Sequence, residues 1–279
     1  MMVWKGVRGL IKKIIRKLPF IYGFCYKQMC AIKKYREALQ QATQEESYYR
    51  YGTVYSNKME KLRGKYKGER CFIIGNGPSL SIEDLSKLKN EYTFAANRIF
   101  GLYDKTDWRP TFYCVQDYSF IREMSSKIKE VIDEAQYNFF PYNMESEYLG
   151  KIARKKNVQR FFLDFTSFIP EKGPQFSNQA NERIYEGFTV TYASIQLAYY
   201  MGFEKIYLLG VDHSANSYAA ALGTVNMENL NLAQTDKATL AYTVAAEHAK
   251  NNNYRIYNAT RGGYLEVFDR IDFDEIFKD

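Results

Sequence analysis

Cysteine and histidine are scarce in this sequence, and neither is spaced as in a metal site. The four cysteines form no C-x-x-C pair, and neither of the two histidines lies at ligand spacing from them. A zinc site and a disulfide framework are therefore not expected. Cys71 and Cys114 fall in apolar runs, which predicts buried thiols, and the lack of a disulfide framework favours a reducing compartment.

Long hydrophobic runs are also missing. No stretch of about 18 uncharged apolar residues occurs, so no transmembrane helix is expected. Lysines and arginines interrupt the start of the chain too often for the apolar core of a signal peptide. The chain of 279 residues does have an apolar share of 46%, which is enough for a sizeable globular core.

Positive charge is concentrated at one end of the chain. Residues 1–40 hold ten lysines and arginines and one acidic residue, whereas residues 41–279 hold 29 basic and 31 acidic residues. A nucleic-acid enzyme usually carries positive charge across the binding face of its main domain. Nucleic acid is therefore not expected as a partner, and the net charge of +7 points to a function of the N-terminus.

The N-terminal segment has the pattern of an amphipathic helix. Between Val3 and Leu18 apolar residues recur every three or four positions, six lysines and arginines fill the other arc, and Pro19 ends the pattern. A helix with one apolar and one cationic face can lie in the headgroup layer of an anionic membrane. We therefore expect residues 1–48 to form a helical membrane-surface segment, with the protein in the cytoplasm on the inner face of the cell membrane. The alternative is a helix that docks on its own domain or on a partner.

Residues 49–279 are expected to form one Rossmann-like nucleotide-binding domain. Short apolar runs alternate with helical patterns, which predicts an α/β fold with a mostly parallel sheet and helices on both faces. The expected strands are residues 71–74, 92–96, 111–115, 160–163, 205–209 and 254–257. The expected helices are residues 81–89, 121–135, 191–201 and 235–250. The aromatic-rich stretch 137–148 and the loop 171–186 receive no assigned role.

A glycine-rich loop, Gly75-Asn76-Gly77-Pro78-Ser79, follows the first expected strand. In sheets of this type, ligands bind outside the carboxyl ends of the strands. The glycines permit a tight turn and a close approach of the backbone, and Ser79 or Ser81 can cap the next helix. The N-terminus of that helix is then a site for phosphate. An ordinary turn between a strand and a helix explains the same residues equally well.

Polar residues also follow the other expected strands. These strand ends carry Asn97, Gln116, Asp117, Asp212, His213, Asn258, Thr260 and Arg261. Because the carboxyl ends of parallel strands meet at one edge of a sheet, we expect these side chains to converge there. Capping of turns is the commoner role of Asn and Asp, and it is the alternative for each residue taken alone.

Four strings of residues resemble those of a known family, at positions 73–80, 96–99, 209–214 and 256–263. They read Ile-Ile-Gly-Asn-Gly-Pro-Ser-Leu, Ala-Asn-Arg-Ile, Leu-Gly-Val-Asp-His-Ser and Ile-Tyr-Asn-Ala-Thr-Arg-Gly-Gly. Residues 67–277 resemble the MptE-like 6-hydroxymethylpterin diphosphokinase domain family, whose bacterial members often accompany surface-polysaccharide synthesis. More distantly, the loop 75–79, Asn97 and the segment 202–212 are similar to bacterial sialyltransferases that use CMP-sialic acid. Both resemblances imply a Rossmann-like nucleotide site.

The sialyltransferase resemblance implies roles for individual residues. Asn76 and the backbone of residues 75–79 would hold the nucleotide phosphate and ribose, and Asn97 would lie near the cytidine or the donor sugar. The turn that holds Thr189 and Thr191 would lie at the base. With the strand-end residues, the candidate nucleotide-binding set is Gly75, Asn76, Gly77, Pro78, Ser79, Asn97, Thr189, Thr191, Asn258, Thr260 and Arg261.

The candidate catalytic residues are His213, Asp212 and Asp117. In the sialyltransferases a histidine removes the proton of the acceptor hydroxyl without a metal, but residues 214–235, where it would fall, contain no histidine here. His213, beside Asp212 at a strand end, is the replacement, since an imidazole titrates near neutral pH. A hydrogen bond within the turn is its alternative role. His248 lies in the middle of an expected helix and is expected to be a structural or a surface residue.

Three functions compete. The first is a glycosyltransferase that moves a nucleotide-activated sugar, CMP-linked in the leading hypothesis, onto a glycan or lipid-linked acceptor in bacterial cell-surface polysaccharide synthesis. The second is an ATP-dependent 6-hydroxymethylpterin diphosphokinase, in which Mg²⁺ would bind Asp117 and Asp212. The third is a non-catalytic, membrane-tethered nucleotide-binding module. Outside the diphosphokinase hypothesis, no metal or cofactor is implied.

Overall fold

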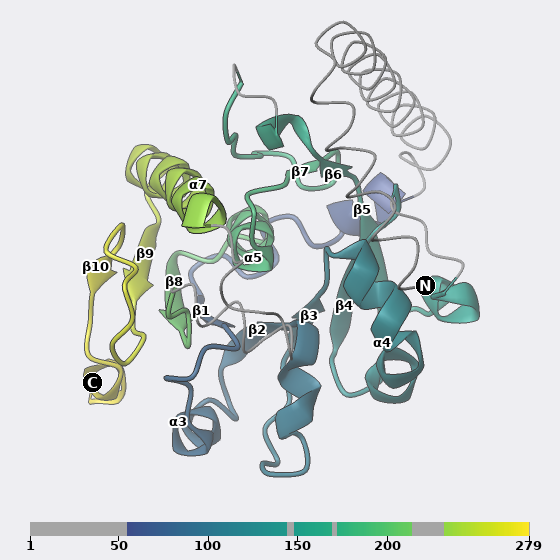
Figure 1. Cartoon of the computed structure of the whole chain (residues 1–279), viewed down its shortest axis with the longest axis horizontal. Helices are drawn as coiled ribbons and strands as arrows, with labels where there is room; N and C mark the ends of the chain where they lie inside the picture. Colours follow the sequence, from purple (N-terminus) through teal and green to yellow (C-terminus); the bar gives the residue numbers. More distant parts are fainter. Residues whose placement is uncertain (1–54, 144–147, 169–171, 214–231, 279) are drawn as a thin grey trace, which may run out of the picture. The chain divides into compact units, whose positions relative to one another are not determined.

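The computed structural model describes residues 55–143, 148–168, 172–213 and 232–278 (Figure 1). The basic segment 1–48, with its expected amphipathic helix, lies outside the described residues, so its membrane role stays a prediction. Within the described part of the chain, no helix is long and apolar enough to cross a membrane.

A parallel sheet forms the centre of the described domain. Its eight described strands lie in the order β10-β9-β8-β1-β2-β3-β4-β5, and each neighbouring pair is parallel. The bounds are β1 (Arg70–Ile74), β2 (Tyr92–Ala96), β3 (Phe112–Cys114), β4 (Tyr137–Pro141), β5 (Val158–Phe161), β8 (Lys205–Leu209), β9 (Arg255–Asn258) and β10 (Asp269–Arg270). Most residues of the central strands are buried, as expected for a parallel sheet with both faces covered.

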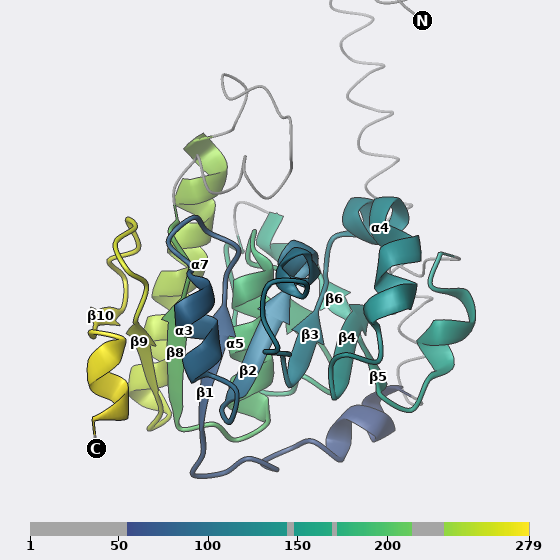
Figure 2. The ribbon, with the colours of Figure 1, turned by 90° about the horizontal axis from the view of Figure 1, so that it is seen from below.

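Helices cover both faces of this sheet, which confirms the expected Rossmann-like α/β fold. On one face lie α5 (Val190–Tyr200) and α7 (Leu232–Asn251), and on the other lie α3 (Ile82–Lys87) and α4 (Tyr118–Val131), as Figures 1 and 2 show. Short 3-10 helices fill connections, at η1 (Asn97–Leu102), η2 (Gly150–Arg154), η3 (Thr166–Phe168) and η5 (Asp274–Phe277).

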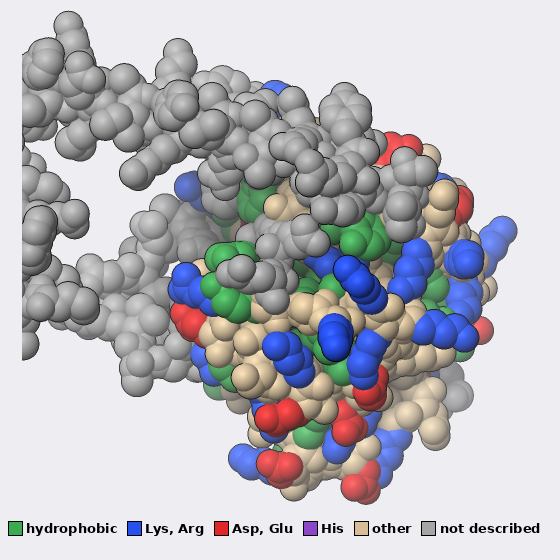
Figure 3. All heavy atoms as spheres, turned by 90° about the vertical axis from the view of Figure 1, so that its right-hand side faces the viewer, with side chains coloured by type: hydrophobic (Ala, Val, Ile, Leu, Met, Phe, Trp, Pro, Cys, Tyr) green, Lys and Arg blue, Asp and Glu red, His purple; other side chains and the backbone are tan. Residues whose placement is uncertain are grey.

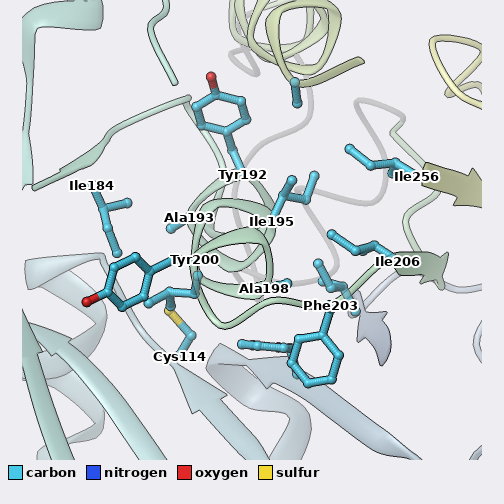
Figure 4. Packing of buried hydrophobic residues seen from close by; sticks show 14 of the residues in the cluster. Cys114, Ile184, Tyr192, Ala193, Ile195, Ala198, Tyr200, Phe203, Ile206 and Ile256 are labelled. Carbon is cyan, nitrogen blue, oxygen red and sulfur yellow. The ribbon is translucent and has the colours of Figure 1, made fainter. Parts of the chain in front are cut away.

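Helix α5 is buried on nearly every side. Figure 4 shows its side chains, among them Tyr192 and Ile195, surrounded by residues of the sheet and of neighbouring loops such as Phe203 and Ile206. Burial of a large apolar side chain contributes about 1.5–3 kcal/mol. The helix is therefore held firmly, and its first turn has a fixed position at the carboxyl edge of the sheet.

The face on the α4 side of the domain carries charges of both signs (Figure 3). Lys127 bonds to Glu130 at 3.1 Å, and Lys155 pairs with Asp133. Exposed ion pairs of this kind contribute little to stability. The mixed charge agrees with the near-neutral balance of residues 41–279.

Three parts of the sheet differ from the expectation. The aromatic-rich stretch 137–148 begins with strand β4, and the expected strand at 160–163 is divided between two sheets. After Phe161 the chain leaves the main sheet, and β6 (Leu163–Asp164) pairs instead with β7 (Ile184–Tyr185). Strands β7 and β10 have two residues each, which is too short for a recognisable pattern.

Candidate functional site

The loop after β1 packs directly on the end of β8. Gly75 N donates to Leu209 O at 2.8 Å, and Gly77 N donates to Gly210 O at 2.9 Å. A Cβ atom on Gly75 would lie 2.2 Å from Gly210 O, and one on Gly77 would lie 1.8 Å from an oxygen of Asp212. These contacts explain why both positions hold glycine, because no side chain fits between the two backbones.

A pocket opens at this edge of the sheet. Residues from the ends of β1, β2 and β8, from the start of α5 and from α7 make up its wall. They are Ile73, Ile74, Gly75, Asn76, Gly77, Ala95, Ala96, Asn97, Thr189, Val190, Thr191, Ser194, Gly210, Val211, Asp212, His213 and Tyr242. The structure therefore brings together most of the residues predicted at strand ends β1, β2 and β8, in the place where α/β sheets bind ligands.

The helix that presents its N-terminus to the pocket is α5. Thr189 caps it by accepting from Thr191 N at 3.3 Å, and both residues lie in the pocket wall. Ser81 caps α3 as expected, accepting from Asp84 N at 3.0 Å, but α3 has only six residues and contributes none to this wall. The helix N-terminus that lines the pocket is therefore that of α5, and not that of α3, where the sequence predicted the phosphate site.

Asn76 and Asn97 follow the ends of β1 and β2. Asn76 Nδ2 donates to Ala96 O at 3.0 Å, which fixes the glycine loop to the next strand. Asn97 has a left-handed backbone with φ of 51°, and Tyr113 Oη donates to its carbonyl at 2.7 Å. Its Oδ1 atom is buried and has no partner among the described residues. Because buried acceptors are rarely left without a donor, an ordered water or a ligand group is the expected partner of this atom.

Asp212 and His213 form the β8 side of the pocket. Ser79 Oγ donates to Asp212 Oδ2 at 2.8 Å, so Ser79 supports the pocket from outside its wall. His213 has a φ of 52°, its Nε2 lies 2.8 Å from Thr239 Oγ1, and its ring meets Tyr242 edge-on. A left-handed conformation at a non-glycine residue is held by its surroundings and is common at functional sites.

Other candidates lie outside the pocket wall. Asn258 Nδ2 donates to Leu265 O at 2.7 Å and holds the segment after β9, whereas Thr260 Oγ1 accepts from Val211 N at 3.1 Å and braces the end of β8. Asp117 caps α4, accepting from Phe120 N at 3.1 Å. Pro78 is not part of the wall either. A direct role for these residues in binding or catalysis stays a prediction.

Arg261 is engaged in an ion-pair cluster on the α3 side. It donates to both oxygens of Asp84 at 2.9 Å, and also to Asp274 at 2.9 Å. Its hydrogen bonds to these carboxylates raise the pKa of Arg261. Asp84 is 2% exposed, and the Arg261 guanidinium offsets the cost of burying its carboxyl group.

We expect Arg261→Ala to destabilise the fold by about 2 kcal/mol, because it leaves the buried Asp84 carboxylate unpaired. Urea denaturation measures this loss, and Lys278→Ala, which removes only the exposed partner of Glu275, is the control with almost no change. Nucleotide affinity is expected to stay within about threefold. A loss of affinity without a loss of stability would instead make Arg261 a nucleotide ligand.

Sequence reasoning missed one buried carboxyl group near the pocket. Glu186 precedes the cap of α5, and its Oε1 accepts from Phe188 N at 2.7 Å and from Gln116 Nε2 at 3.2 Å. Burial raises the pKa of Glu186 to about 7. The loop 171–186 has no periodicity that marks this residue as buried, although Gln116 was expected at the sheet edge.

His248, Cys71 and Cys114 are placed as structural residues, in agreement with the sequence predictions for them. His248 stacks on Phe176, with a hydrogen bond to Tyr254 Oη at 3.0 Å, and burial lowers its pKa. Cys71 and Cys114 are buried and free. Among the described residues, no group of three or more His, Cys, Asp or Glu side chains is arranged to hold a metal ion.

The fold is similar to that of solved glycosyltransferases. The MAf glycosyltransferase from Magnetospirillum magneticum AMB-1 has a TM-score of 0.49 and 14% identity, with 78% of this chain and 38% of that chain covered. This chain thus spans well under half the length of that enzyme. The sialyltransferase CstII from Campylobacter jejuni in complex with cytidine-5'-monophosphate has a TM-score of 0.45 and 16% identity, with 72% and 84% covered.

Among curated proteins, none matches the sequence. The profile of the family described as 6-hydroxymethylpterin diphosphokinase MptE-like matches residues 45–217, which is more than half of the 279 residues. This match includes the glycine loop, the ends of β2 and β3, the first turn of α5 and the end of β8. The chain therefore belongs to the MptE-like 6-hydroxymethylpterin diphosphokinase family.

Proposed function

We propose that this protein is a glycosyltransferase that takes a nucleotide-activated sugar, CMP-linked in our leading hypothesis, and acts in bacterial cell-surface polysaccharide synthesis. One observation carries the proposal. A single pocket combines the glycine loop and the first turn of α5 with the Asp212 and His213 side of β8. The glycine loop and the first turn of α5 suit a phosphate group. Asp212 and His213 supply polar side chains for the transfer reaction.

The phosphate end of the donor fits between the glycine loop and α5. Backbone N–H groups at the start of a helix carry partial positive charge and favour an anion. Gly75 and Gly77 allow a ligand to approach the backbone closely, since neither has a side chain. Asn97, with its buried Oδ1 atom in the wall, can accept from a hydroxyl of the ribose or the sugar.

His213 is our candidate for the general base. In the proposed step, the acceptor hydroxyl attacks the anomeric carbon of the sugar while His213 takes its proton. A new glycosidic C–O bond forms, the C–O bond to the phosphate breaks, and the nucleotide leaves with the bonding electrons. Asp212, next in sequence and also in the wall, would stabilise the imidazolium.

The N-terminal segment supports a lipid-linked glycan as the acceptor. Residues 1–40 carry ten basic residues, and an amphipathic helix there would hold the pocket near the membrane surface. Lipid-linked glycan acceptors lie at that surface. We therefore propose an acceptor of this kind, and a position in the cytoplasm at the inner face of the cell membrane.

Pyrophosphate transfer from ATP to a pterin is the second candidate, because the family is described by that activity. It requires carboxylates that hold Mg²⁺ at the phosphates. Asp212 is in the pocket wall, but Asp117, the expected second carboxylate, caps α4 outside it. This placement supports ranking the diphosphokinase below the glycosyltransferase.

Calorimetry with the full-length protein tests these candidates. CMP, CDP, ATP and GDP are titrated, each with and without Mg²⁺. We expect CMP to bind without the metal. Preference for ATP with Mg²⁺ supports the diphosphokinase, and binding of none of the four supports a non-catalytic module.

Within this experiment, Asn97→Gly is expected to weaken nucleotide binding about tenfold. Glycine keeps the left-handed backbone and removes only the carboxamide, so the change deletes one buried hydrogen bond. Asn253→Gly is the matched control, because Asn253 is also left-handed, with φ of 59°, but is exposed after α7. Equal affinities for the two variants would remove Asn97 from the site.

A further inference from the structure

The edge of the sheet at β5 carries an excess of positive charge. β5 is the last strand in the sheet order, and two segments lie beside it: the helical residues 55–60 with the turn that follows, and the connection from β4 to β5. Figure 3 shows lysine and arginine side chains gathered on this face of the domain. We call the six basic residues of the two segments the β5 basic edge: Lys58, Lys61, Lys151, Arg154, Lys155 and Lys156.

Lys58 joins the two segments. Its Nζ atom donates to Lys155 O at 3.1 Å, and it also donates to Val158 O at the start of β5. Burial and the nearby positive charge of Lys61 lower the pKa of Lys58. Cations that lie 97 residues apart in the sequence are therefore held together on one surface.

Helix η2 presents its cations to solvent. Lys151 and Arg154 are three residues apart, and such residues lie on the same side of a 3-10 helix. Both are exposed, whereas Ile152 and Ala153 are partly buried and pack against the core. The apolar side of η2 thus fixes the helix on the domain, and its cationic side remains accessible.

Few carboxylates balance this charge. Within the described part of the chain, the only ion pair of the β5 basic edge joins Lys155 to Asp133. Cations close to this edge in sequence are paired, by contrast, as Lys127 is with Glu130. The β5 basic edge therefore keeps a net positive charge, which attracts an anionic surface.

The chain enters the described domain at this same edge. Tyr55, the first described residue, packs on Tyr142 directly after β4, with ring centroids 5.0 Å apart. Only residues 49–54 separate Tyr55 from the basic segment 1–48. Because a chain spans at most about 3.6 Å per residue, a membrane that binds this segment lies close to the β5 basic edge.

We propose that the β5 basic edge is a second membrane contact, which binds the headgroups of anionic lipids. This inference rests on the proposed position at the membrane surface and extends it, since the folded domain would touch the membrane together with the N-terminal segment. Two weak contacts on one molecule bind more strongly than either contact alone. β5 is separated from the pocket strands β8, β1 and β2 by β3 and β4, so lipid binding leaves the pocket open.

Neutralising the exposed part of the edge tests the proposal. The full-length protein with Lys151→Gln, Arg154→Gln and Lys156→Gln is sedimented with vesicles of equal parts phosphatidylcholine and phosphatidylglycerol. Partition onto these vesicles is expected to fall about tenfold or more, because each cation near an anionic membrane strengthens binding severalfold. We expect Tm and nucleotide affinity to stay unchanged, since these side chains are exposed and lie outside the pocket wall.

The matched control removes the same charge from the other end of the sheet. Lys205→Gln, Lys250→Gln and Arg255→Gln change three exposed cations at β8, α7 and β9, and partition is expected to stay within about twofold. An equal loss in both triple variants shows that only the net charge matters and overturns the proposal. Unchanged partition of the β5 variant overturns it too, and leaves the N-terminal segment as the membrane contact.

A third variant separates this contact from the N-terminal segment. With Lys12, Lys13, Arg16 and Lys17 replaced by Gln, we expect weaker binding to the anionic vesicles, which the β5 substitutions then abolish and which high salt removes. If adding the β5 substitutions causes no further loss, the β5 basic edge binds no lipid. Binding to an RNA oligonucleotide without binding to vesicles overturns the proposal as well. Absence of vesicle binding in the unmodified protein refutes both membrane contacts, whereas nucleotide calorimetry still tests the transferase.

Discussion

Gly75→Ala is expected to destabilise the fold by about 3 kcal/mol and to abolish nucleotide binding. The added Cβ atom would lie 2.2 Å from Gly210 O and 2.7 Å from Gly210 C, far inside van der Waals contact. Both neighbours are backbone atoms at the end of β8, so they can retreat only if the loop and the strand separate. Separation breaks the bonds from Gly75 N to Leu209 O and from Gly77 N to Gly210 O.

Urea denaturation measures the expected loss of stability, and calorimetry measures the expected loss of nucleotide binding. Gly101→Ala is the matched control, since a Cβ atom at that exposed position has no neighbour within 4 Å. That variant is expected to keep both the stability and the affinity of the unmodified protein. If Gly75→Ala retained nucleotide binding with unchanged affinity, the glycine loop would be a structural turn and the pocket would need another phosphate site.

The central sheet was predictable because its strands are continuous apolar runs. Residues 71–74, 92–96 and 205–209 form β1, β2 and β8 within one residue of the expected bounds, and short continuous apolar runs are typical of strands in a parallel sheet that is covered on both faces. Strand β4 was missed because the aromatic stretch 137–148 gives no clear alternation. Its Asn138 is fully buried and donates to Ile132 O, a pairing that only the folded chain makes visible.

The position of the candidate site was predictable from the same strands. Polar residues after β1, β2 and β8 had to meet at one edge, and they do so in one pocket. The individual partners were not predictable, because each depends on a residue far away in sequence. Arg261 bonds to Asp84, which is 177 residues distant, and Ser79 bonds to Asp212, which is 133 residues distant.

Glu186 shows a second limit of the sequence. A glutamate in a loop without periodicity is usually exposed, and only its contacts reveal that this one is buried. The same holds for α5 as the helix whose first turn lines the pocket, since the glycine motif draws attention to α3. Glu186 and the first turn of α5 both lie where the loop 171–186 returns to the sheet. This side of the candidate site therefore depends on tertiary contacts, which a local sequence pattern does not reveal.

Glu186 is expected to make the folded protein less stable as the pH rises. Burial raises its pKa to about 7 in the folded state, from an ordinary value of 4.5. The folded protein therefore binds this proton more tightly than the unfolded chain does, and the stability it contributes is full below about pH 4.5. That stability is lost as the pH rises toward 7, by about 3 kcal/mol in total, and the loss is complete above that range.

The difference between the unmodified protein and Glu186→Gln isolates this effect, because all other groups titrate alike in both. Urea denaturation at pH values from about 5 to 8 is expected to show a difference that grows toward neutral pH in favour of Glu186→Gln. Glu182→Gln, at an exposed position just before β7, is expected to show a constant difference. A difference that is independent of pH without ligand would show that Glu186 is ionised throughout and already paired in the folded state.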